Sequence, residues 1–181
     1  MYVKRTIEEA ILRLGQSFPC IVIYGARQVG KTTFLEDYTA LDKISLDDNM
    51  TLALAKDEPA TFLKNNPAPA FIDEIQKAPN LFSQIKFEID RDRSKKGLYY
   101  MTGSEQPKLM RGASESLSGR IGIAKLFGFS MRELFDIDFF SPFLPATEYF
   151  EARKYLINPL TNDELWRLIH RGSMPELLLN D

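Results

Sequence analysis

Short apolar runs alternate with segments of helical periodicity along the first two thirds of the chain. Runs with the length and the β-branched or aromatic content of buried strands cover residues 20–24, 43–47, 70–74, 98–102 and 121–126. Helices are predicted between them, over residues 32–38, 49–56 and 60–65 and from Pro79 onward. Parallel strands need such crossover segments, whereas antiparallel strands can be joined by short turns. The pattern therefore predicts an α/β fold with a mainly parallel five-stranded sheet flanked by helices.

Three segments match the capping box, in which a Ser or Thr side chain and a Glu three residues later satisfy the first amides of a helix. They are Thr6–Glu9, Ser130–Glu133 and Thr161–Glu164. Each segment predicts a helix that begins at that point. Because glycine tolerates the backbone conformation that follows a helix, Gly15 is expected to end the first of the three.

From about residue 136 onward the pattern contains only helix and loop. We therefore expect a core domain over residues 1–136 and a helical extension over residues 137–181. An aromatic cluster opens the extension and either packs against the core or presents a surface to a partner or to a missing domain; its members are Phe135, Ile137, Phe139, Phe140 and Phe143. The apolar run at residues 177–179 lacks an evident partner, which suggests that the protein continues into a further C-terminal domain.

Composition is typical of a globular protein, with 44% hydrophobic and 27% charged residues in a chain of 181. A net charge of −2 provides no general attraction for nucleic acid. The single cysteine, Cys20, cannot form an internal disulfide and suits a small buried position in the first strand, which favours a reducing compartment. No apolar run approaches the roughly 18 residues that a membrane helix needs. We expect a cytoplasmic protein that does not associate with membranes.

A glycine-rich segment follows the first predicted strand and has the form Gly-x-x-x-x-Gly-Lys-Thr. Its glycines let the backbone curl so that successive amides face phosphate oxygens, and the positive end of the next helix faces the same anion. In such a loop Lys31 reaches the β- and γ-phosphates and the Thr32 hydroxyl binds Mg²⁺, while Arg27 either touches phosphate or faces solvent. The residues predicted to bind nucleotide are Gly25, Ala26, Arg27, Gln28, Val29, Gly30, Lys31, Thr32 and Thr33.

Two acidic residues, Asp73 and Glu74, end the third predicted strand. Asp73 can hold Mg²⁺ beside Thr32, directly or through water. Glu74 is expected to project toward the γ-phosphate, where it can orient and deprotonate an attacking water. A guanine-specific protein would carry Asn-Lys-x-Asp, which this chain lacks. Because a small-molecule kinase transfers phosphate to its substrate and not to water, it could lack Glu74, so the acidic pair favours ATP hydrolysis.

Two further polar positions can complete the site. The turn after the fourth predicted strand is expected to place a polar side chain between the two motifs, in contact with the γ-phosphate or the water. Thr102 or Ser104 can supply that side chain, and we carry Ser104 as the candidate catalytic residue. Arg120, directly before the fifth strand, can neutralise charge on the transferred phosphoryl group, in cis or from a neighbouring subunit, or can be a surface arginine.

Together these segments resemble the prokaryotic AAA-type P-loop ATPases that carry a C-terminal domain of unknown function. The matching segments are Gly25–Thr33, Phe71–Gln76, Thr102–Ser104 and Glu115–Arg120. Residues 172–176 resemble the family's Gly-Gly-Phe-Pro-Glu segment, from which Ser173 and Met174 depart. The resemblance implies an ATPase domain followed by helical elements. It also implies that the family's C-terminal domain, sometimes described as nuclease-like, is absent here.

The leading hypothesis from the sequence is an Mg²⁺-dependent ATPase in which water attacks the γ-phosphate of ATP in line. Its candidate catalytic residues are Lys31, Glu74, Ser104 and Arg120, and its candidate metal ligands are Thr32 and Asp73. One alternative is a nucleotide-gated binding module whose slow hydrolysis resets an interaction with an unidentified protein. Another is a regulator of DNA processing, which the net charge supports only weakly. If Arg120 acts in trans, the protein must form a homo-oligomer.

Overall fold

The computed structural model describes residues 2–104, 113, 116–139, 141, 143–156 and 160–179. The chain forms two compact units: one comprises Ile7–Phe127, and the other joins Met1–Thr6 to Gly128–Asp181. The first unit contains the sheet and the nucleotide motifs. The division between the units precedes the expected boundary at residue 136, because Glu133 binds the N-terminal segment.

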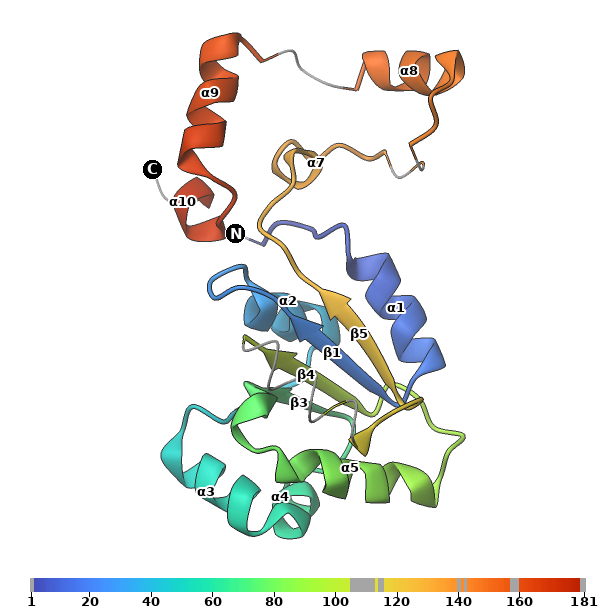
Figure 1. Cartoon of the computed structure of the whole chain (residues 1–181), viewed down its shortest axis with the longest axis vertical. Coiled ribbons are helices and arrows are strands. Elements are labelled where there is room, and N and C mark those ends of the chain that lie inside the picture. Colours follow the sequence, from blue (N-terminus) through green and yellow to red (C-terminus); the bar gives the residue numbers. More distant parts are fainter. Residues whose placement is uncertain are drawn as a thin grey trace. The chain divides into compact units, whose positions relative to one another are not determined.

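A five-stranded sheet forms the centre of the first unit (Figure 1). Its strands are β1 (Cys20–Tyr24), β2 (Lys43–Ser45), β3 (Ala70–Asp73), β4 (Tyr99–Gly103) and β5 (Ile121–Lys125). The strand order is β2-β3-β4-β1-β5, and every pairing is parallel. The predicted α/β fold class is therefore confirmed, and all five predicted strands form with small differences at their ends.

Helices pack on both faces of the sheet, as the apolar strands require (Figure 1). One face carries α1 (Glu8–Ser17) and α2 (Lys31–Thr39), and the other carries α3 (Asn49–Asp57), α4 (Pro59–Asn65) and α5 (Asn80–Arg91). A 3₁₀ turn, η1 (Ile75–Lys77), lies between β3 and α5. Local chemistry sets the helix starts: the Asp48 side chain accepts a hydrogen bond from the Thr51 amide at 2.8 Å to cap α3, and proline begins α4.

The main hydrophobic core lies between the sheet and the second group of helices. Val22, Met101 and Ile72 stand in register on β1, β4 and β3, and they belong to one cluster with Phe62 of α4 and Phe82 of α5. Cys20 is fully buried in the same cluster, as expected for a small hydrophobic residue, and burial raises the pKa of its thiol. This rigid layer fixes the strand ends that carry the nucleotide motifs.

Two of the helix-end predictions at α1 are wrong. Gly15 does not end α1, which continues to Ser17; a Cβ added at Gly15 would lie 3.1 Å from the Tyr100 hydroxyl oxygen, which makes this a close contact between α1 and β4. Nor does Thr6 cap α1, which begins after Ile7 without a side-chain cap. The Thr6 hydroxyl donates instead to the Glu133 carboxylate at 2.7 Å.

The second unit consists of helices joined by irregular segments. They are α7 (Met131–Leu134), α8 (Thr147–Lys154), α9 (Asn162–Arg171) and α10 (Pro175–Leu179). The predicted capping boxes at Ser130 and Thr161 both form. Across the described residues, no helix combines the length and the apolar character needed to cross a bilayer.

Part of the predicted aromatic cluster packs within this second unit. Phe139 and Phe143 make edge-to-face contacts with Tyr149, at ring-centroid distances of 5.3 and 5.4 Å, and Phe143 also contacts Phe150. Phe140 lies outside the described residues. The aromatic cluster thus packs against Tyr149 and Phe150 of α8.

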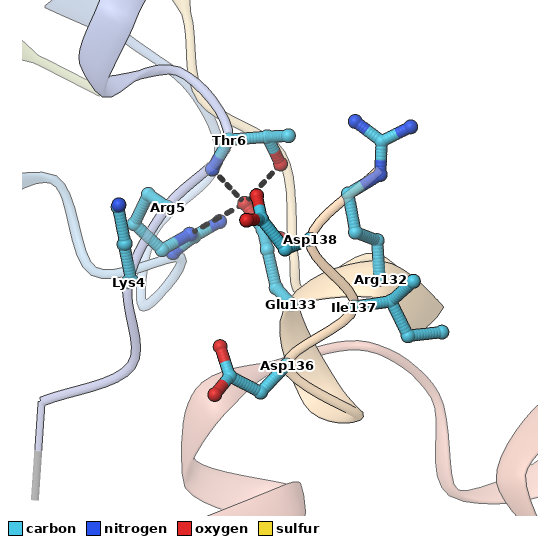
Figure 2. A pocket seen from close by; sticks show the side chains of 8 residues that line it. All are labelled: Lys4, Arg5, Thr6, Arg132, Glu133, Asp136, Ile137 and Asp138. Carbon is cyan, nitrogen blue, oxygen red and sulfur yellow. Dashed lines mark hydrogen bonds and ion pairs between the residues drawn. The ribbon is translucent and has the colours of Figure 1, made fainter. Parts of the chain in front are cut away.

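Glu133 joins the two separate stretches of sequence that make up the second unit, and it lines a pocket of about 260 Å³ (Figure 2). Its Oε1 accepts hydrogen bonds from the Thr6 amide at 2.7 Å and from Arg5 Nε at 3.2 Å, and its Oε2 accepts from the Ser130 amide at 2.8 Å. Burial by itself would raise the pKa of Glu133, but the hydrogen bonds from Thr6 and Ser130 and the charge of Arg5 lower it. The ionised carboxylate therefore stabilises the docking of residues 2–6.

Replacing Glu133 with Gln should lower the free energy of unfolding at pH 7 by about 2 kcal/mol, because the buried charge-assisted hydrogen bonds are weakened. The wild-type advantage should shrink as the pH falls from the ordinary glutamate pKa toward the lower pKa of Glu133 in the folded protein, where the carboxylate gains its proton. Urea denaturation at pH 7 and at about pH 4 measures both effects. Glu151→Gln, an exposed change on α8, is the control. An equal loss at both pH values would contradict the assignment.

Candidate active site

The loop between β1 and α2 has the backbone of an anion cradle. Gln28 and Gly30 both adopt the left-handed conformation, with φ of 65° and 89°, which turns the chain sharply into α2. Gly30 is the N-cap of α2, and no side chain of the described structure caps the first turn of that helix. The amides at the start of α2 therefore remain available to an anion.

Lys31 is held inside this loop. Its side chain is only 6% exposed, and its Nζ donates to the backbone oxygens of Gly25 at 3.2 Å and Ala26 at 2.8 Å. Burial lowers the pKa of Lys31, while the negative charges of Glu74 and Asp73 oppose that shift. The lysine is thus positioned at the centre of the cradle, beside two carboxylates.

Gly25 is required by a close backbone approach. A Cβ at this position would lie 2.2 Å from the carbonyl oxygen of Leu126, which follows β5. Val29 is buried, whereas Ala26, Arg27 and Gln28 are exposed. Thr33 is also exposed, on the first turn of α2. The predicted loop residues therefore divide into buried ones, which shape the loop, and exposed ones, which are accessible to a ligand or to solvent.

The strand order brings the acidic pair to the loop. Because β4 lies between β1 and β3, the carboxyl ends of all three strands meet at one edge of the sheet. There the Thr32 hydroxyl lies 3.1 Å from Asp73 Oδ1 and 3.3 Å from Oδ2, to which it donates. Within the described residues no group of three or more His, Cys, Asp or Glu side chains forms a metal site by itself.

Thr102 connects the two acidic residues. It is fully buried on β4, its hydroxyl donates to Asp73 Oδ1, and its oxygen accepts a hydrogen bond from the Glu74 amide at 3.2 Å. A hydroxyl has one proton, so the proton that Thr102 gives to Asp73 is not available to a ligand. Of the two candidates from the sequence, Thr102 is therefore built into the framework and Ser104 is the more accessible.

Glu74 occupies a strained position directly after β3. Its φ of 58° is left-handed, an uncommon conformation for a residue other than glycine. The Ser104 hydroxyl donates to Glu74 Oε2 at 2.9 Å, and Gln76 Nε2 donates to the same oxygen. Sequence reasoning assigned no role to Gln76. Its position two residues after Glu74, in a turn that follows a buried strand, was the available signal.

Arg120 is not brought to the cradle. Its backbone oxygen accepts a hydrogen bond from the Cys20 amide at 3.1 Å, which places it at the amino end of the sheet. The loop follows the carboxyl end of β1, about 16 Å away along the strands. The Arg120 guanidinium binds the Asp90 carboxylate through Nη2, at 2.9 and 3.1 Å, and hydrogen bonds from Arg120 lower the pKa of Asp90. A role for Arg120 at the cradle of its own chain is therefore not supported.

This arrangement agrees with comparisons to known proteins. Residues 17–135, more than half of the chain, match the family described as AAA domain. The chain belongs to this family. The resemblance to AAA-type P-loop ATPases is thereby confirmed over those residues, which run from the end of α1 to just beyond α7.

Relatives of this AAA domain include two mycobacterial proteins, both described as uncharacterised. They are Rv2008c of Mycobacterium tuberculosis and Mb2031c of Mycobacterium bovis, each 31% identical over 118 residues. The match covers 64% of this chain but only 26% of each relative, so the chain spans about a quarter of their length. Among solved structures, the Walker-type ATPase PABY2304 of Pyrococcus abyssi has the same fold, with a TM-score of 0.59 and 15% identity over 98% of this chain and 66% of that one.

Replacing Thr102 with Val should lower the free energy of unfolding by about 2 kcal/mol, since the Glu74 amide loses its acceptor and Asp73 loses a buried donor. Thr102→Ser keeps the hydroxyl and removes one methyl group, so its cost should be about 1 kcal/mol. Urea denaturation of both variants provides the comparison. A valine variant as stable as the serine variant would show that the hydroxyl does not hold the site together.

Proposed function

We propose that this AAA domain binds ATP with Mg²⁺ and hydrolyses it by attack of water on the γ-phosphate. The observation that carries the proposal is the assembly of Thr32, Asp73 and Glu74 beside a phosphate cradle at one edge of the sheet. These residues would position the reactants and stabilise developing charge, which are the main requirements of phosphoryl transfer.

The cradle would bind the phosphate groups of ATP. The amides at the start of α2 point along the helix dipole toward an anion, and Lys31 supplies a positive charge from inside the loop. Membership of the AAA domain family supports nucleotide binding at this loop. Arg27, exposed on the loop, would contact phosphate or solvent.

Thr32 and Asp73 would hold Mg²⁺. Their oxygens lie within 3.1 Å of each other, and hydroxyl and carboxylate oxygens are the ligands that a hard divalent cation prefers. When bound, the cation would neutralise negative charge on the β- and γ-phosphates. The chain supplies two ligand side chains at this point, which suits a metal that usually completes its coordination with water and phosphate oxygens.

Glu74 would accept the proton of the attacking water, and Ser104 would contact the water or the γ-phosphate. Glu74 lies directly after Asp73, the proposed metal ligand, and its carboxylate accepts a hydrogen bond from Ser104 at the edge of the sheet. A positioned carboxylate of this kind typically accelerates the proton-transfer step by about two to four orders of magnitude.

Arg120 would act on the site of a neighbouring copy in a homo-oligomer. It lies on the opposite edge of the sheet from the cradle of its own chain, and its side chain is 25% exposed. If phosphate oxygens replaced the Asp90 carboxylate, the Arg120 guanidinium would keep two paired hydrogen bonds.

Glu74→Gln should lower kcat for ATP by about 100-fold or more, because the amide cannot accept the proton of the water. The dissociation constant for ATP should stay within about threefold of the wild-type value, since the phosphate and metal contacts remain. Phosphate release and fluorescent-nucleotide displacement measure the two quantities. Glu58→Gln, at an exposed position between α3 and α4, is the matched control. Full turnover by Glu74→Gln would remove Glu74 as the base.

Arg120→Ala should lower kcat by about 1,000-fold if the arginine reaches the phosphate of a neighbour. A mixture of Arg120→Ala and Glu74→Gln should regain turnover, because an intact site then meets an intact arginine across the interface. Arg93→Ala is the control, since Arg93 also binds Asp90 but is more exposed. If mixing restores nothing and turnover of Arg120→Ala equals that of the control, Arg120 has only its structural pairing with Asp90.

A nucleotide-gated binding module is a second candidate, favoured by the apolar side chains on the second unit. Trp166, Phe143 and Tyr155 are 66%, 66% and 83% exposed, which is unusual for large aromatic residues. In this case ATP would bind at the same site and hydrolysis would be slow. Turnover of the chain alone separates the candidates, because a free-standing enzyme should be fast without a partner.

A further inference from the structure

We propose that Gln76 is a positioning residue that orients the Glu74 carboxylate for attack of water on ATP. This inference rests on the proposed hydrolysis and adds a residue to it. Gln76 is 6% exposed and lies in the η1 turn that follows Glu74. The turn folds the Gln76 side chain back toward the residue two positions earlier, so that the two side chains meet at the edge of the sheet.

The hydrogen bonds define which end of the Gln76 amide faces Glu74. Nε2 lies within hydrogen-bonding distance of Glu74 Oε2 and 3.4 Å from the Ser104 hydroxyl oxygen. An ionised carboxylate can only accept hydrogen bonds, so the nitrogen and not the oxygen of the amide must face it. Gln76 therefore acts as a donor to the proposed base.

The two donors are distributed unequally over the carboxylate. Ser104 and Gln76 both donate to Oε2 of Glu74, whereas among the described residues no donor contacts Oε1. Two donors on one oxygen restrict rotation of the carboxylate about its last bond. They leave the lone pairs of the second oxygen available to accept a proton, which is what a general base at this position requires.

The other end of the Gln76 amide argues against a purely structural role. Gln76 Oε1 is buried and has no hydrogen-bond donor among the described residues. Burying an unsatisfied polar oxygen is unfavourable, so an apolar side chain of similar shape would fold at least as well. An amide at this position is explained by its contact with Glu74 better than by any contribution to stability.

The test compares Gln76→Met with the wild-type protein. Methionine preserves length and volume but removes the donor, so kcat should fall about tenfold or more while KM and the dissociation constant for ATP stay within about twofold. The melting temperature should be unchanged or higher. Gln84→Met is the matched control, because the Gln84 amide also faces a carboxylate, that of Glu88 at 3.5 Å, but lies on α5 away from the site.

A second variant, Gln76→Leu, guards against misfolding of the first. It also removes the donor and introduces no charge, so it should likewise lower kcat with little change in KM. Wild-type kcat in either folded variant overturns the proposal, as does a fall in melting temperature that accounts for the whole loss of activity. The proposed function fails separately, if the wild-type protein itself does not bind and hydrolyse ATP.

Discussion

The geometry of the candidate site depends on the two hydrogen bonds of the Thr102 hydroxyl. It donates to Asp73 and accepts from the backbone of Glu74, so a single group sets the positions of the proposed metal ligand and the proposed base. It can do so only because β4 lies between β1 and β3. If β4 did not lie between β1 and β3, the acidic pair and the glycine-rich loop would not meet across one buried threonine.

The same edge of the sheet concentrates charge in a partly buried setting. Lys31 lies inside the loop, and burial lowers its pKa while Asp73 and Glu74 raise it. Opposite charges at such a place interact more strongly than they would at an exposed surface, because the surrounding protein screens them less than water does. Thr102, Ser104 and Gln76 each contribute a hydrogen bond that holds Glu74 at this edge of the sheet.

Much of this fold follows from local patterns, whereas the roles of single side chains at the site depend on backbone geometry and on contacts between distant segments. The five strands, the cradle loop and the acidic pair lie in short stretches whose composition is informative by itself. The choice between Thr102 and Ser104 depends on which of the two side chains is buried at the end of β4. The role of Gln76 depends on the η1 turn, which brings its side chain to Glu74. The capping pattern at Thr6 failed because Glu133, distant in sequence, competes for the same hydroxyl.

The placement of Arg120 is a consequence of sheet polarity. In a parallel sheet, the residue before one strand and the loop after its neighbour lie at opposite edges, however close the two strands are. Asp90 then provides the paired acceptor that a guanidinium favours, on a surface where neither partner is fully buried. Both side chains remain partly exposed, so solvent screens this pair more than it would screen a fully buried one. Because the glycine-rich loop and Arg120 lie at opposite edges of the sheet, the proposed role of Arg120 requires that copies of the chain associate head to tail.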